Sequence, residues 1–481
     1  MAKKNTAYFR DKLTTVDEQG KRVWLYPKKP KGRYFNKRKI LAIVLLAFLY
    51  AGPFIKVHGQ PLLLFNIFER KFILFGTVFW PQDFHLIVLM LITLILFVVL
   101  FTVIFGRLFC GWVCPQTIFM EFVFRRIEYL IEGDSAAQRR LAKQPWDFEK
   151  VWKKTLKHLV FYAIAFITAN TFLAYIIGID QLMVYIKEGP LQHLPGFIGL
   201  LIFSGVFYFI FAFFREQVCT IACPYGRLQS VLIDPKTLIV AYDYKRGEPR
   251  GPLSKAKEGN LGDCVNCNAC VAVCPTGIDI RNGTQLECIN CTACIDACDA
   301  TMEKVNRPKG LIRYDSEEGI ETGKHHLFNT RSIAYSLVLT ALLVFVGFLF
   351  ALRGDYEVTI LRARGSMYQE YGKDSLSNIY NYNIVNKSRH DIHVNMKLLS
   401  PPGTIHFIGG NLTVPFGQSA NGTFLVVLPK KEMHSSEIPI VIGLFHNGKK
   451  VENYHSTFVA PNSLDTPSSG SSHAKKNKNE N

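Results

Sequence analysis

The chain has 481 residues, of which 49% are hydrophobic and 20% are charged, and its formal net charge at pH 7 is +18. This length leaves room for two or three domains, and the mixture suits a chain that is partly membrane-embedded and partly soluble. A basic excess also occurs in nucleic-acid-binding proteins, but Lys and Arg collect in the cytoplasmic loops of membrane proteins, so we predict no nucleic-acid partner. The twelve cysteines fall into four tight groups, which argues against a secreted disulfide scaffold and indicates metal or redox sites.

Residues 1–39 are predicted to be a basic cytoplasmic arm. The first apolar run begins near Ile40 and has no small-residue cleavage site, so we expect a retained anchor rather than a signal peptide. Several apolar stretches approach the length that crosses a bilayer as a helix. Five spans are predicted, at residues 40–57, 84–105, 159–178, 194–214 and 333–352.

The segment of residues 61–80 is also apolar and aromatic, but it contains Glu69, Arg70 and Lys71 in sequence. A membrane span there would bury charge in hydrocarbon, which is costly. We therefore predict that this segment is interfacial.

Basic residues predict the orientation of the spans. They cluster before the first span, between the second and third, and between the fourth and fifth, whereas residues 179–193 hold only Lys187. Because cytoplasmic loops are rich in Lys and Arg, the N-terminus and residues 215–331 are predicted to be cytoplasmic. The chain after about Arg353 then lies outside, which in a bacterial inner membrane is the periplasm.

Matching cysteine motifs end the second and fourth spans. Residues 110–115 read CGWVCP and residues 219–224 read CTIACP, so C-x3-C-P occurs twice at corresponding places. Both spans run inward, so both pairs are predicted to reach the cytoplasmic face, as in an internal repeat. Cysteines four apart in a helix lie on one side of it and can share a soft metal ion or undergo redox together.

The prolines of these motifs predict a second local feature. A residue before proline is pushed out of the helical region and proline favours the first turn, so Cys114 and Cys223 are predicted to cap new helices. A thiol at a helix N-terminus has a lowered pKa, and Arg107 and Arg215 are expected to act in the same direction.

These four thiols are candidates for a copper site or a thiol redox site, because thiolates are the preferred ligands of Cu(I). The alternative is that they are buried small residues, as free cysteines often are. A structural disulfide is not expected in the cytoplasm. The candidate residues are Cys110, Cys114, Cys219 and Cys223.

The strongest pattern is a two-cluster ferredoxin run. Residues 264–275 read CVNCNACVAVCP and residues 288–298 read CINCTACIDAC. In such runs three closely spaced cysteines surround one [4Fe–4S] cluster and the fourth ligates the other cluster. The first cluster is therefore predicted to be held by Cys264, Cys267, Cys270 and Cys298. The second is predicted to be held by Cys288, Cys291, Cys294 and Cys274.

Two structural zinc sites are the alternative, since zinc also takes four thiolates. Zinc ligands rarely repeat as three closely spaced cysteines plus a fourth, so iron–sulfur clusters are favoured. One departure from the pattern is that Cys298 is followed by Asp299 rather than proline. This departure leaves all eight predicted ligands in place.

Short alternating apolar runs separated by Pro- and Gly-containing turns extend from about Asp355 to Pro461. They predict an all-β sandwich of immunoglobulin-like size, without the cysteine pair of antibody domains. Residues from Ser463 onward are rich in Ser, Lys and Asn and are predicted to be disordered.

The predicted fold class is therefore a multi-domain membrane protein with an α-helical transmembrane bundle of about five spans. An α+β two-cluster ferredoxin-like domain and a C-terminal all-β immunoglobulin-like domain complete it. The predicted domains are the arm (1–39), a four-helix membrane region (40–232), the ferredoxin-like domain (233–332), the fifth helix (333–353), the β domain (354–462) and the tail (463–481).

With CGWVCP, CTIACP, the two-cluster run, a further span and a β domain in this order, the chain from its first span to Pro461 resembles the CcoG family. This family, also called FixG or RdxA, comprises accessory proteins for the assembly of cbb3-type cytochrome c oxidase. The resemblance implies a membrane-bound cupric reductase, an oxidoreductase that converts Cu(II) to Cu(I) for insertion into the oxidase. It implies oxidase assembly factors or a copper chaperone as partners. It also implies that the C-x3-C-P cysteines handle copper as the catalytic residues.

A second function is open on the same motifs. The quinol-oxidising membrane ferredoxins of nitrate and nitrous-oxide respiration share twin C-x3-C-P motifs and two clusters, and feed a periplasmic reductase. The long β domain favours CcoG, and no C-x-x-C-H haem motif occurs here. A purely structural assembly scaffold would require inert clusters. The sequence does not indicate the electron donor.

Overall fold

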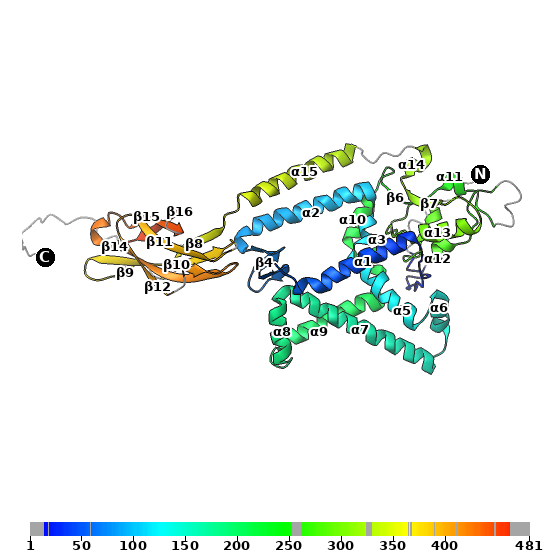
Figure 1. Ribbon diagram of the computed structural model, residues 1–481, viewed down its shortest axis with the longest axis horizontal. Coiled ribbons are helices and arrows are strands. Elements are labelled where there is room, and N and C mark those ends of the chain that lie inside the picture. Colours follow the sequence, from blue (N-terminus) through cyan, green and yellow to red (C-terminus); the bar gives the residue numbers. More distant parts are fainter. Residues whose placement is uncertain are drawn as a thin grey trace, which may run out of the picture. The chain divides into compact units, whose positions relative to one another are not determined.

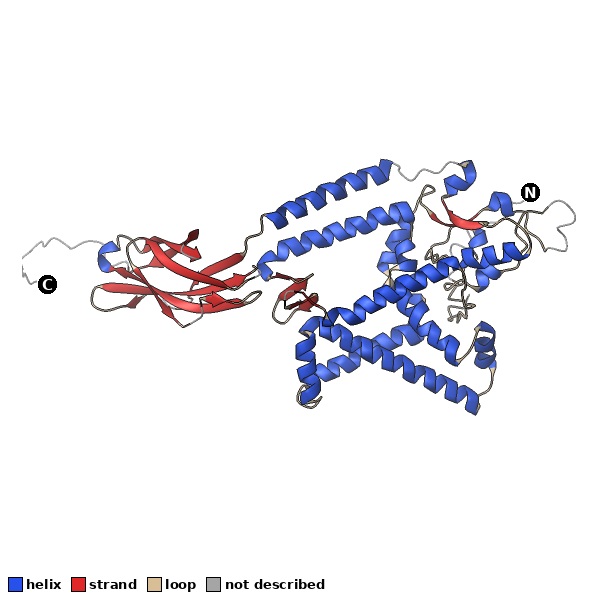
Figure 2. Ribbon diagram, in the orientation of Figure 1, coloured by secondary structure: helices blue, strands red, loops and turns tan. Residues whose placement is uncertain are grey.

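The computed structural model describes residues 14–17, 19–57, 59–252, 261–323, 330–363, 365, 368–388, 390–409, 412–446 and 449–461. The chain divides into two compact units, the first containing most residues up to Ala351 and the second containing the chain from Leu352 together with Gly76–Trp80. Helices dominate the first unit and strands the second (Figures 1 and 2). The tail at residues 463–481 and the first thirteen residues of the basic arm lie outside the described residues.

Within the described residues, four helices are long and apolar enough to cross a membrane. They are Pro81–Phe105, Phe148–Ile177, Leu194–Phe214 and Thr330–Ala351. They correspond to the second to fifth predicted spans, and the third begins earlier than predicted because α7 extends over Phe148–Ile177. Many of their side chains are apolar and exposed to the surroundings, as a lipid-facing surface requires.

The prediction for the first span is only partly right. Helix α1 covers Arg33–Ala51, so residues 40–51 are helical, but the chain then leaves the helix. The first turns of α1 carry Arg33, Lys37, Arg38 and Lys39, which shortens its apolar part below the length of the four spans. Arg38 is buried rather than placed in a solvated loop.

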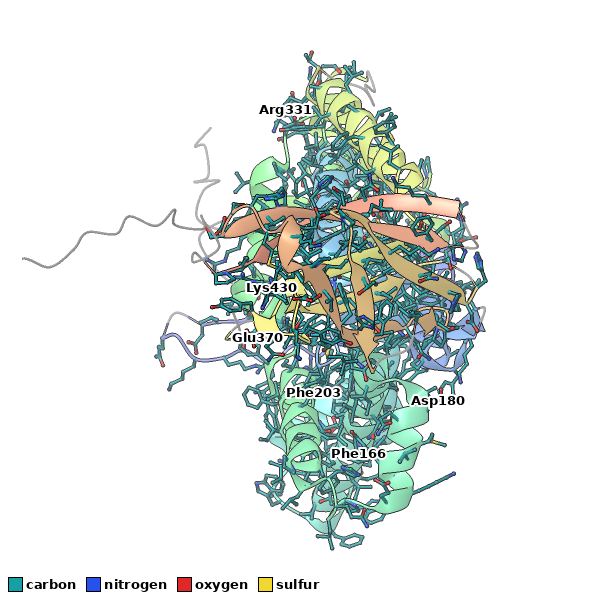
Figure 3. The ribbon with its side chains drawn as sticks, turned by 90° about the vertical axis from the view of Figure 1, so that its left-hand side faces the viewer. Phe166, Asp180, Phe203, Arg331, Glu370 and Lys430 are labelled. Atoms are coloured by element: carbon teal, nitrogen blue, oxygen red, sulfur yellow. The ribbon has the colours of Figure 1, made fainter. Side chains whose placement is uncertain are left out.

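The spanning helices pack in neighbouring pairs. Helix α2 (Phe84–Phe105) packs against α15 (Thr330–Ala351), and α7 packs against α9 (Leu194–Phe209) (Figure 1). Phe166 of α7 and Phe203 of α9 are labelled in Figure 3. The ring of Phe203 lies 5.8 Å from that of Phe172, also on α7. Aromatic packing therefore joins the third and fourth spans.

The segment predicted to be interfacial forms strands rather than a helix. Strands β3 (Leu63–Asn66) and β4 (Lys71–Leu74) pair antiparallel, and Arg70, with φ 54°, lies in the turn between them. The charged residues thus fall at the turn and at the start of β4. No membrane-spanning helix forms in these described residues, as predicted.

The two repeats share an unusual backbone reversal. Gly106 (φ 56°, ψ −138°) ends α2, and Arg215 (φ 54°, ψ −126°) ends the π-helix η4 (Ile210–Phe214). Each of these residues lies four positions before the first cysteine of its motif. A Cβ on Gly106 would lie 2.9 Å from Ile239, so close packing as well as the positive φ requires glycine there. The predicted internal repeat is therefore visible in the backbone.

Short helices follow each reversal and connect the remaining spans. The first repeat continues through α3 (Leu108–Trp112), α4 (Pro115–Ile118), η3 (Phe119–Phe124), α5 (Arg125–Ile131) and α6 (Ser135–Lys143). Helix α8 (Ile179–Glu188) joins α7 to α9. The second repeat continues through η5 (Val218–Ala222) and α10 (Pro224–Leu232).

Buried ion pairs fix the two repeats to each other near their cysteine motifs. Arg215 donates to both carboxylate oxygens of Glu128, at 2.5 and 3.0 Å. Both side chains are about 5% exposed. Burial favours the neutral acid, but the charge and hydrogen bonds of Arg215 outweigh it and lower the pKa of Glu128 to about 2.

We expect Glu128→Gln to destabilise the protein strongly, because it removes the carboxylate that accepts two hydrogen bonds from the buried Arg215 guanidinium and leaves only Glu216, at 3.5 Å, as its counter-ion. Breaking one side of a buried pair removes about 3–5 kcal/mol. Since the pKa of Glu128 is lowered, the pair stabilises the fold above the ordinary glutamate pKa and is lost only as the pH falls through about 2. Thermal unfolding of the detergent-solubilised protein measures the effect. Glu149→Gln, at an exposed pair with Lys153, is the matched control and should leave unfolding unchanged.

The ferredoxin-like domain packs its two cysteine runs around a small apolar core. Strands β6 (Ile239–Tyr242) and β7 (Ile312–Asp315) pair antiparallel, and α12 (Ala269–Ala272) and α13 (Ala293–Lys304) each carry cysteines. Helices α11 (Tyr244–Gly247) and α14 (Glu317–Thr322) lie outside the two runs in sequence. The core includes Val240, Ile278, Ile280, Ile295, Met302 and Leu311.

Helix α1 is attached to the ferredoxin-like domain by a buried carboxylate. Asp296 of α13 accepts hydrogen bonds from the backbone N–H groups of Tyr34 (3.1 Å) and Phe35 (2.7 Å), at the first turn of α1. Backbone N–H groups in the first turn of a helix have no intrahelical acceptor, and their positive end favours an anion. The arrangement places the second cysteine run directly against the first turn of α1.

The second unit is a sandwich of two antiparallel sheets, which confirms the predicted immunoglobulin-like fold. One sheet has the order β12-β14-β10-β8, with β9 on β10, and the other has the order β13-β11-β15-β16. Alternating residues face the core: Tyr380 of β10 is opposite Phe424 of β14 in register, and their ring centroids are 5.6 Å apart. The strands are β8 (Tyr356–Arg362), β9 (Gln369–Glu370), β10 (Ser375–Asn386), β11 (Ile392–Ser400), β12 (Thr404–Ile408), β13 (Thr413–Val414), β14 (Ser419–Pro429), β15 (Glu437–His446) and β16 (Lys449–Val459).

Candidate electron-transfer site

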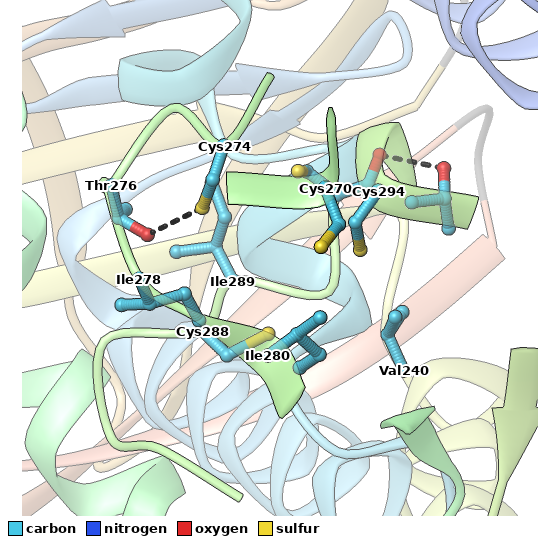
Figure 4. Close-up of a pocket in the computed structure, with 11 residues that line it drawn as sticks. Val240, Cys270, Cys274, Thr276, Ile278, Ile280, Cys288, Ile289 and Cys294 are labelled. Atoms are coloured by element: carbon cyan, nitrogen blue, oxygen red, sulfur yellow. Dashed lines mark hydrogen bonds between the residues drawn. The ribbon is translucent and has the colours of Figure 1, made fainter. Parts of the chain in front are cut away.

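One pocket in the ferredoxin-like domain is lined by the four cysteines predicted for the second cluster. These are Cys274, Cys288, Cys291 and Cys294, and Cys270 of the other run also reaches this pocket. Figure 4 shows Cys274, Cys288 and Cys294 on different segments around one space, with Ile278, Ile280 and Val240 among the apolar residues that close it. Cys274 therefore lies with the second run, although it belongs to the first run in sequence.

A neighbouring pocket is lined by the four cysteines predicted for the first cluster. They are Cys264, Cys267, Cys270 and Cys298. Cys267 is exposed, whereas the other three are buried. The crossed arrangement, in which each run contributes its fourth cysteine to the other pocket, is the one that the spacing predicts.

Residues with a left-handed backbone conformation lie between the cysteines of each run. Asn266 and Asn268 in the first run, and Asn290 and Thr292 in the second, have φ between 51° and 64°. They occupy equivalent places between the cysteines of each run. A non-glycine residue with positive φ is uncommon, and the repeated pattern turns each loop tightly around its pocket.

The donor set fits a [4Fe–4S] cluster at each pocket. Each pocket offers four cysteine sulfurs and mainly apolar walls, as such a cluster requires. Burial raises the pKa of the free Cys288 and Cys298 thiols to about 12, so these cysteines are neutral until a metal replaces their protons.

The C-x3-C-P cysteines lie at the breaks between short helices. Cys110 is in α3 and Cys219 in η5, while Cys114 and Cys223 are the N-caps of α4 and α10. The predicted capping positions are confirmed. The two cysteines of a pair do not lie in one continuous helix, however, because each proline starts a new one.

The predicted lowering of the thiol pKa at a helix N-terminus is wrong for Cys114, and the pKa values of Cys110 and Cys219 are raised as well. Burial raises the pKa of Cys110 to about 11 and that of Cys219 to about 12, and it also raises that of Cys114. The backbone N–H groups of Gln116 and Thr117 and the charge of Arg107 act against this rise but do not reverse it. Desolvation thus outweighs the helix terminus at this depth.

The four thiols influence one another across the two repeats. The pKa of Cys219 is raised first by burial and then by Cys114 and Cys110. That of Cys110 is raised first by burial and then by Cys114 and Cys223. Among the described residues, no three His, Cys, Asp or Glu side chains have the arrangement of a single-ion site. The fold brings the two motifs into one neighbourhood without a preformed single-ion geometry.

A buried glutamine that the sequence pattern did not indicate holds Cys110. The Cys110 thiol donates to Oε1 of Gln229 at 2.8 Å. Gln229, on α10 of the second repeat, donates in turn to Thr102 Oγ1 at 3.0 Å and to the Tyr225 hydroxyl at 2.6 Å. This network links the cysteine of one repeat to the helix that follows the cysteines of the other.

The first cysteine pair abuts the second cluster pocket. Cys110 belongs to the same buried apolar cluster as Val273, Ile289, Cys291 and Ala293. A Cβ on Gly111 would lie 2.3 Å from the Ile289 carbonyl oxygen and 3.0 Å from Cα of Cys291. Only glycine allows this approach. The glycine of CGWVCP was the sequence signal for the contact, which motif reasoning on the cysteines alone missed.

Gly111→Ala should therefore separate the cysteine pair from the second cysteine run. We expect a marked loss of electron transfer between the two, with iron content retained if the domain moves as a body, because backbone atoms of Ile289 cannot yield to a methyl group as a flexible side chain does. Gly199→Ala in α9 is the matched control, since nothing lies within 4 Å of its Cβ position. Full electron-transfer rates in Gly111→Ala would show that the contact is not required.

A third pocket lies between the second cysteine pair and the second cluster pocket. It is lined by Cys219, Pro275, Thr276 and Ile289 together with the polar residues Glu121, Arg125, Arg215 and Glu216. The guanidinium of Arg125 bonds to Glu121 and donates to Glu216 at 3.4 Å and to the Pro275 carbonyl at 3.2 Å. These pairs connect the inner ends of both repeats to the loop after Cys274.

Three family models match the chain. Residues 214–317 match a 4Fe-4S dicluster domain, and residues 86–132 match a 4Fe-4S binding domain. Residues 346–461 match the IG-like fold at the C-terminal of FixG. The first two segments together contain all of the cysteines, and the chain is therefore an iron–sulfur protein. Both C-x3-C-P motifs lie within these two matches.

Curated relatives match over most of the chain. Protein RdxA of Cereibacter sphaeroides is 34% identical over 421 residues, which cover 85% of this chain and 89% of RdxA. Protein RdxB of the same organism is 34% identical over 78% of this chain and 83% of RdxB. The nitrogen fixation protein FixG of Rhizobium meliloti is 39% identical over 61% of this chain and 57% of FixG.

Proposed function

This chain belongs to the FixG/RdxA family of membrane iron–sulfur electron-transfer proteins, and on that premise we propose that it reduces Cu(II) to Cu(I) at its C-x3-C-P cysteines. The proposal includes the use of this Cu(I) in assembling cbb3-type cytochrome c oxidase, with assembly factors or a copper chaperone as partners. The protein is then a cupric reductase of the bacterial inner membrane.

The observation that carries the proposal is the contact between Cys110 and the second cluster pocket. Cys110 and Cys291 belong to one buried cluster, and Gly111 lies against the backbone that presents Cys291. Thiolates favour Cu(I) over Cu(II), so a cysteine site beside an electron-transfer centre favours the reduced product. One electron is consumed for each Cu(II) converted to Cu(I).

The two cysteine sets have separate roles in this proposal. When bound, the [4Fe–4S] clusters supply one-electron transfer, and we assign their ligands as the two crossed sets that line the two pockets. Cys110, Cys114, Cys219 and Cys223 bind the copper substrate. Gln229 orients the Cys110 thiol through its 2.8 Å hydrogen bond, and its own bonds to Thr102 and Tyr225 hold it in place.

Anaerobic copper reduction tests this function directly. Purified protein reduced beforehand should convert added Cu(II) to Cu(I), detected with a Cu(I)-specific chromogenic chelator, as its clusters are reoxidised. Cluster reoxidation without Cu(I) would contradict a cupric reductase. The quinol-oxidising alternative predicts instead that a soluble quinol reduces the oxidised clusters, whether or not copper is present.

The proposed topology places the cysteines in the cytoplasm and the β domain in the periplasm, because basic residues flank the inner ends of the spans. A reporter fused after Gly354 should be active outside, and one fused near Gly251 inside. If both reporters were active on the same side, the fifth helix, Thr330–Ala351, would not cross the membrane.

A further inference from the structure

Two buried arginines lie close enough to the second cysteine run for their charges to act on Cys291 and Cys288. Arg38 of α1 is 2% exposed and Arg107, just before α3, is 3% exposed. Nε of Arg38 donates to the Gly111 carbonyl at 3.1 Å, at the residue that contacts Ile289 and Cys291. Nη1 of Arg107 donates to the carbonyl of Leu286, two residues before Cys288. Arg107 is thus tied to the backbone that leads into the second cysteine run, and Arg38 is tied to the backbone of Gly111, which touches that run.

Neither arginine is neutralised by a carboxylate partner in the part of the chain that the structure describes. Their hydrogen bonds to oxygen atoms go to backbone carbonyls, Arg107 also contacts the Cys110 thiol, and neither arginine takes part in an ion pair among the described residues. Nη2 of Arg38 and Nε of Arg107 are buried without a hydrogen-bond partner among these residues. Buried guanidinium groups rarely lack an acceptor, so each has a donor available for an anionic group beside it.

The first cluster pocket is surrounded differently. Its arginine, Arg281, is held by Asp279 through two hydrogen bonds of 2.7 and 2.8 Å, which cancel its charge. Asp299 follows Cys298 directly and adds a negative charge. The second pocket has acids nearby as well: Glu121 is paired with Arg125, and Asp296 is bonded to the first turn of α1. Of the two pockets, only the second therefore has buried arginines that lack a carboxylate partner among the described residues.

We propose that Arg38 and Arg107 are positioning residues that raise the reduction potential of the second cluster above that of the first. Positive charge and N–H donors stabilise the more negative, reduced form of an iron–sulfur cluster. Exposure of Cys267 to solvent raises the reduction potential of the first cluster and so reduces the difference between the two potentials. This effect is smaller than that of the arginines, because buried full charges interact with a cluster more strongly than water does at a partly exposed edge. The exposed first cluster is then the entry for electrons and the second, beside Cys110, is the exit.

This inference rests on the cluster assignment within the proposed function, but not on copper. It also explains a feature of α1, whose basic first turns carry Arg38 into a buried position instead of leaving it in a loop. Asp296 fixes the first turn of α1 on α13, so the guanidinium is held in register with the second cysteine run.

Anaerobic redox titration followed by electron paramagnetic resonance tests the proposal in the full-length protein. The wild type should show two midpoint potentials, with the lower one at the first cluster; Cys267→Ser and Cys291→Ser identify the two signals. Arg38→Gln and Arg107→Gln should each lower only the second potential, by about a tenfold change in the one-electron equilibrium, or about 59 mV. Arg38→Lys, which keeps the charge, should shift it less.

Arg33→Gln is the matched control, because Arg33 is on the same helix but exposed, and it should leave both potentials unchanged. Equal wild-type potentials, or a lower potential at the second cluster, overturn the proposal without any variant. An unshifted second potential in either glutamine variant that retains its iron also overturns it. If Arg38→Gln loses iron, Arg107→Gln decides. If the two potentials are as predicted but the protein does not reduce Cu(II), the result contradicts copper as the substrate and leaves the assignment of the potentials intact.

Discussion

Replacing both cysteines of either C-x3-C-P pair by serine is expected to abolish copper reduction while leaving the iron content nearly unchanged. Serine is a far poorer ligand than cysteine for a soft ion. The loss should exceed the roughly 10- to 100-fold reduction that follows from changes in the outer shell of a metal site. The pairs are Cys110 with Cys114 and Cys219 with Cys223. Cu(I) binding and the rate of Cu(II) reduction are measured with iron and sulfide verified.

Both pairs should be necessary, because the fold brings Cys219 near Cys110 and Cys114 of the other repeat and all four thiols are proposed to bind the copper. Ala222→Ser is the matched control: it adds a hydroxyl within the second motif, at an exposed position, and removes no thiol. We expect it to reduce copper normally. Wild-type rates of copper reduction in the double serine variants would contradict this role and support the alternative, in which these cysteines are buried small residues.

Changes at the cluster cysteines should lower the iron content directly and abolish copper reduction only as a consequence. The wild-type protein should contain about eight iron and eight sulfide per chain, as two four-iron clusters require. Cys291→Ser or Cys267→Ser should lower the iron content toward about four, with copper reduction lost as a consequence. Chemical analysis of anaerobically purified protein measures the iron and sulfide.

Two other iron counts have distinct meanings. Stoichiometric zinc with little iron would contradict the cluster assignment. About twelve iron per chain, the content of three four-iron clusters, would instead place a third cluster at the C-x3-C-P cysteines. That outcome would accord with the match of residues 86–132 to a 4Fe-4S binding domain, and it would exclude these cysteines as the copper site.

The covalent spacing of the cysteines predicted which cysteines line the same pocket. Closely spaced ligands in the two C-x2-C-x2-C-x3-C runs place the cysteines around two pockets in the crossed arrangement. The sandwich was equally predictable, because alternation along strands such as Ser375–Asn386 leaves few other folds. Both predictions rest on local pattern.

Features that depend on tertiary packing were missed. Hydropathy cannot show that Arg38 is buried at Gly111, because its acceptor is a backbone carbonyl 73 residues away. The same holds for Gln229, which accepts a hydrogen bond from Cys110 although 119 residues separate the two in sequence. The predicted fall in the pKa of Cys114 is wrong because a helix N-terminus can be predicted from sequence, whereas desolvation, the larger effect on this thiol, depends on the folded surroundings.

The central claim is that electrons from the ferredoxin-like domain reduce copper held by the C-x3-C-P cysteines. Its most direct test is rapid anaerobic mixing of pre-reduced protein with Cu(II), following cluster reoxidation and Cu(I) formation together in the wild type and in the Cys110→Ser, Cys114→Ser variant with its clusters verified. The account predicts that one Cu(I) forms for each electron lost from the wild type, and that the variant retains its electrons. Equally fast, stoichiometric Cu(I) formation in the variant would contradict it.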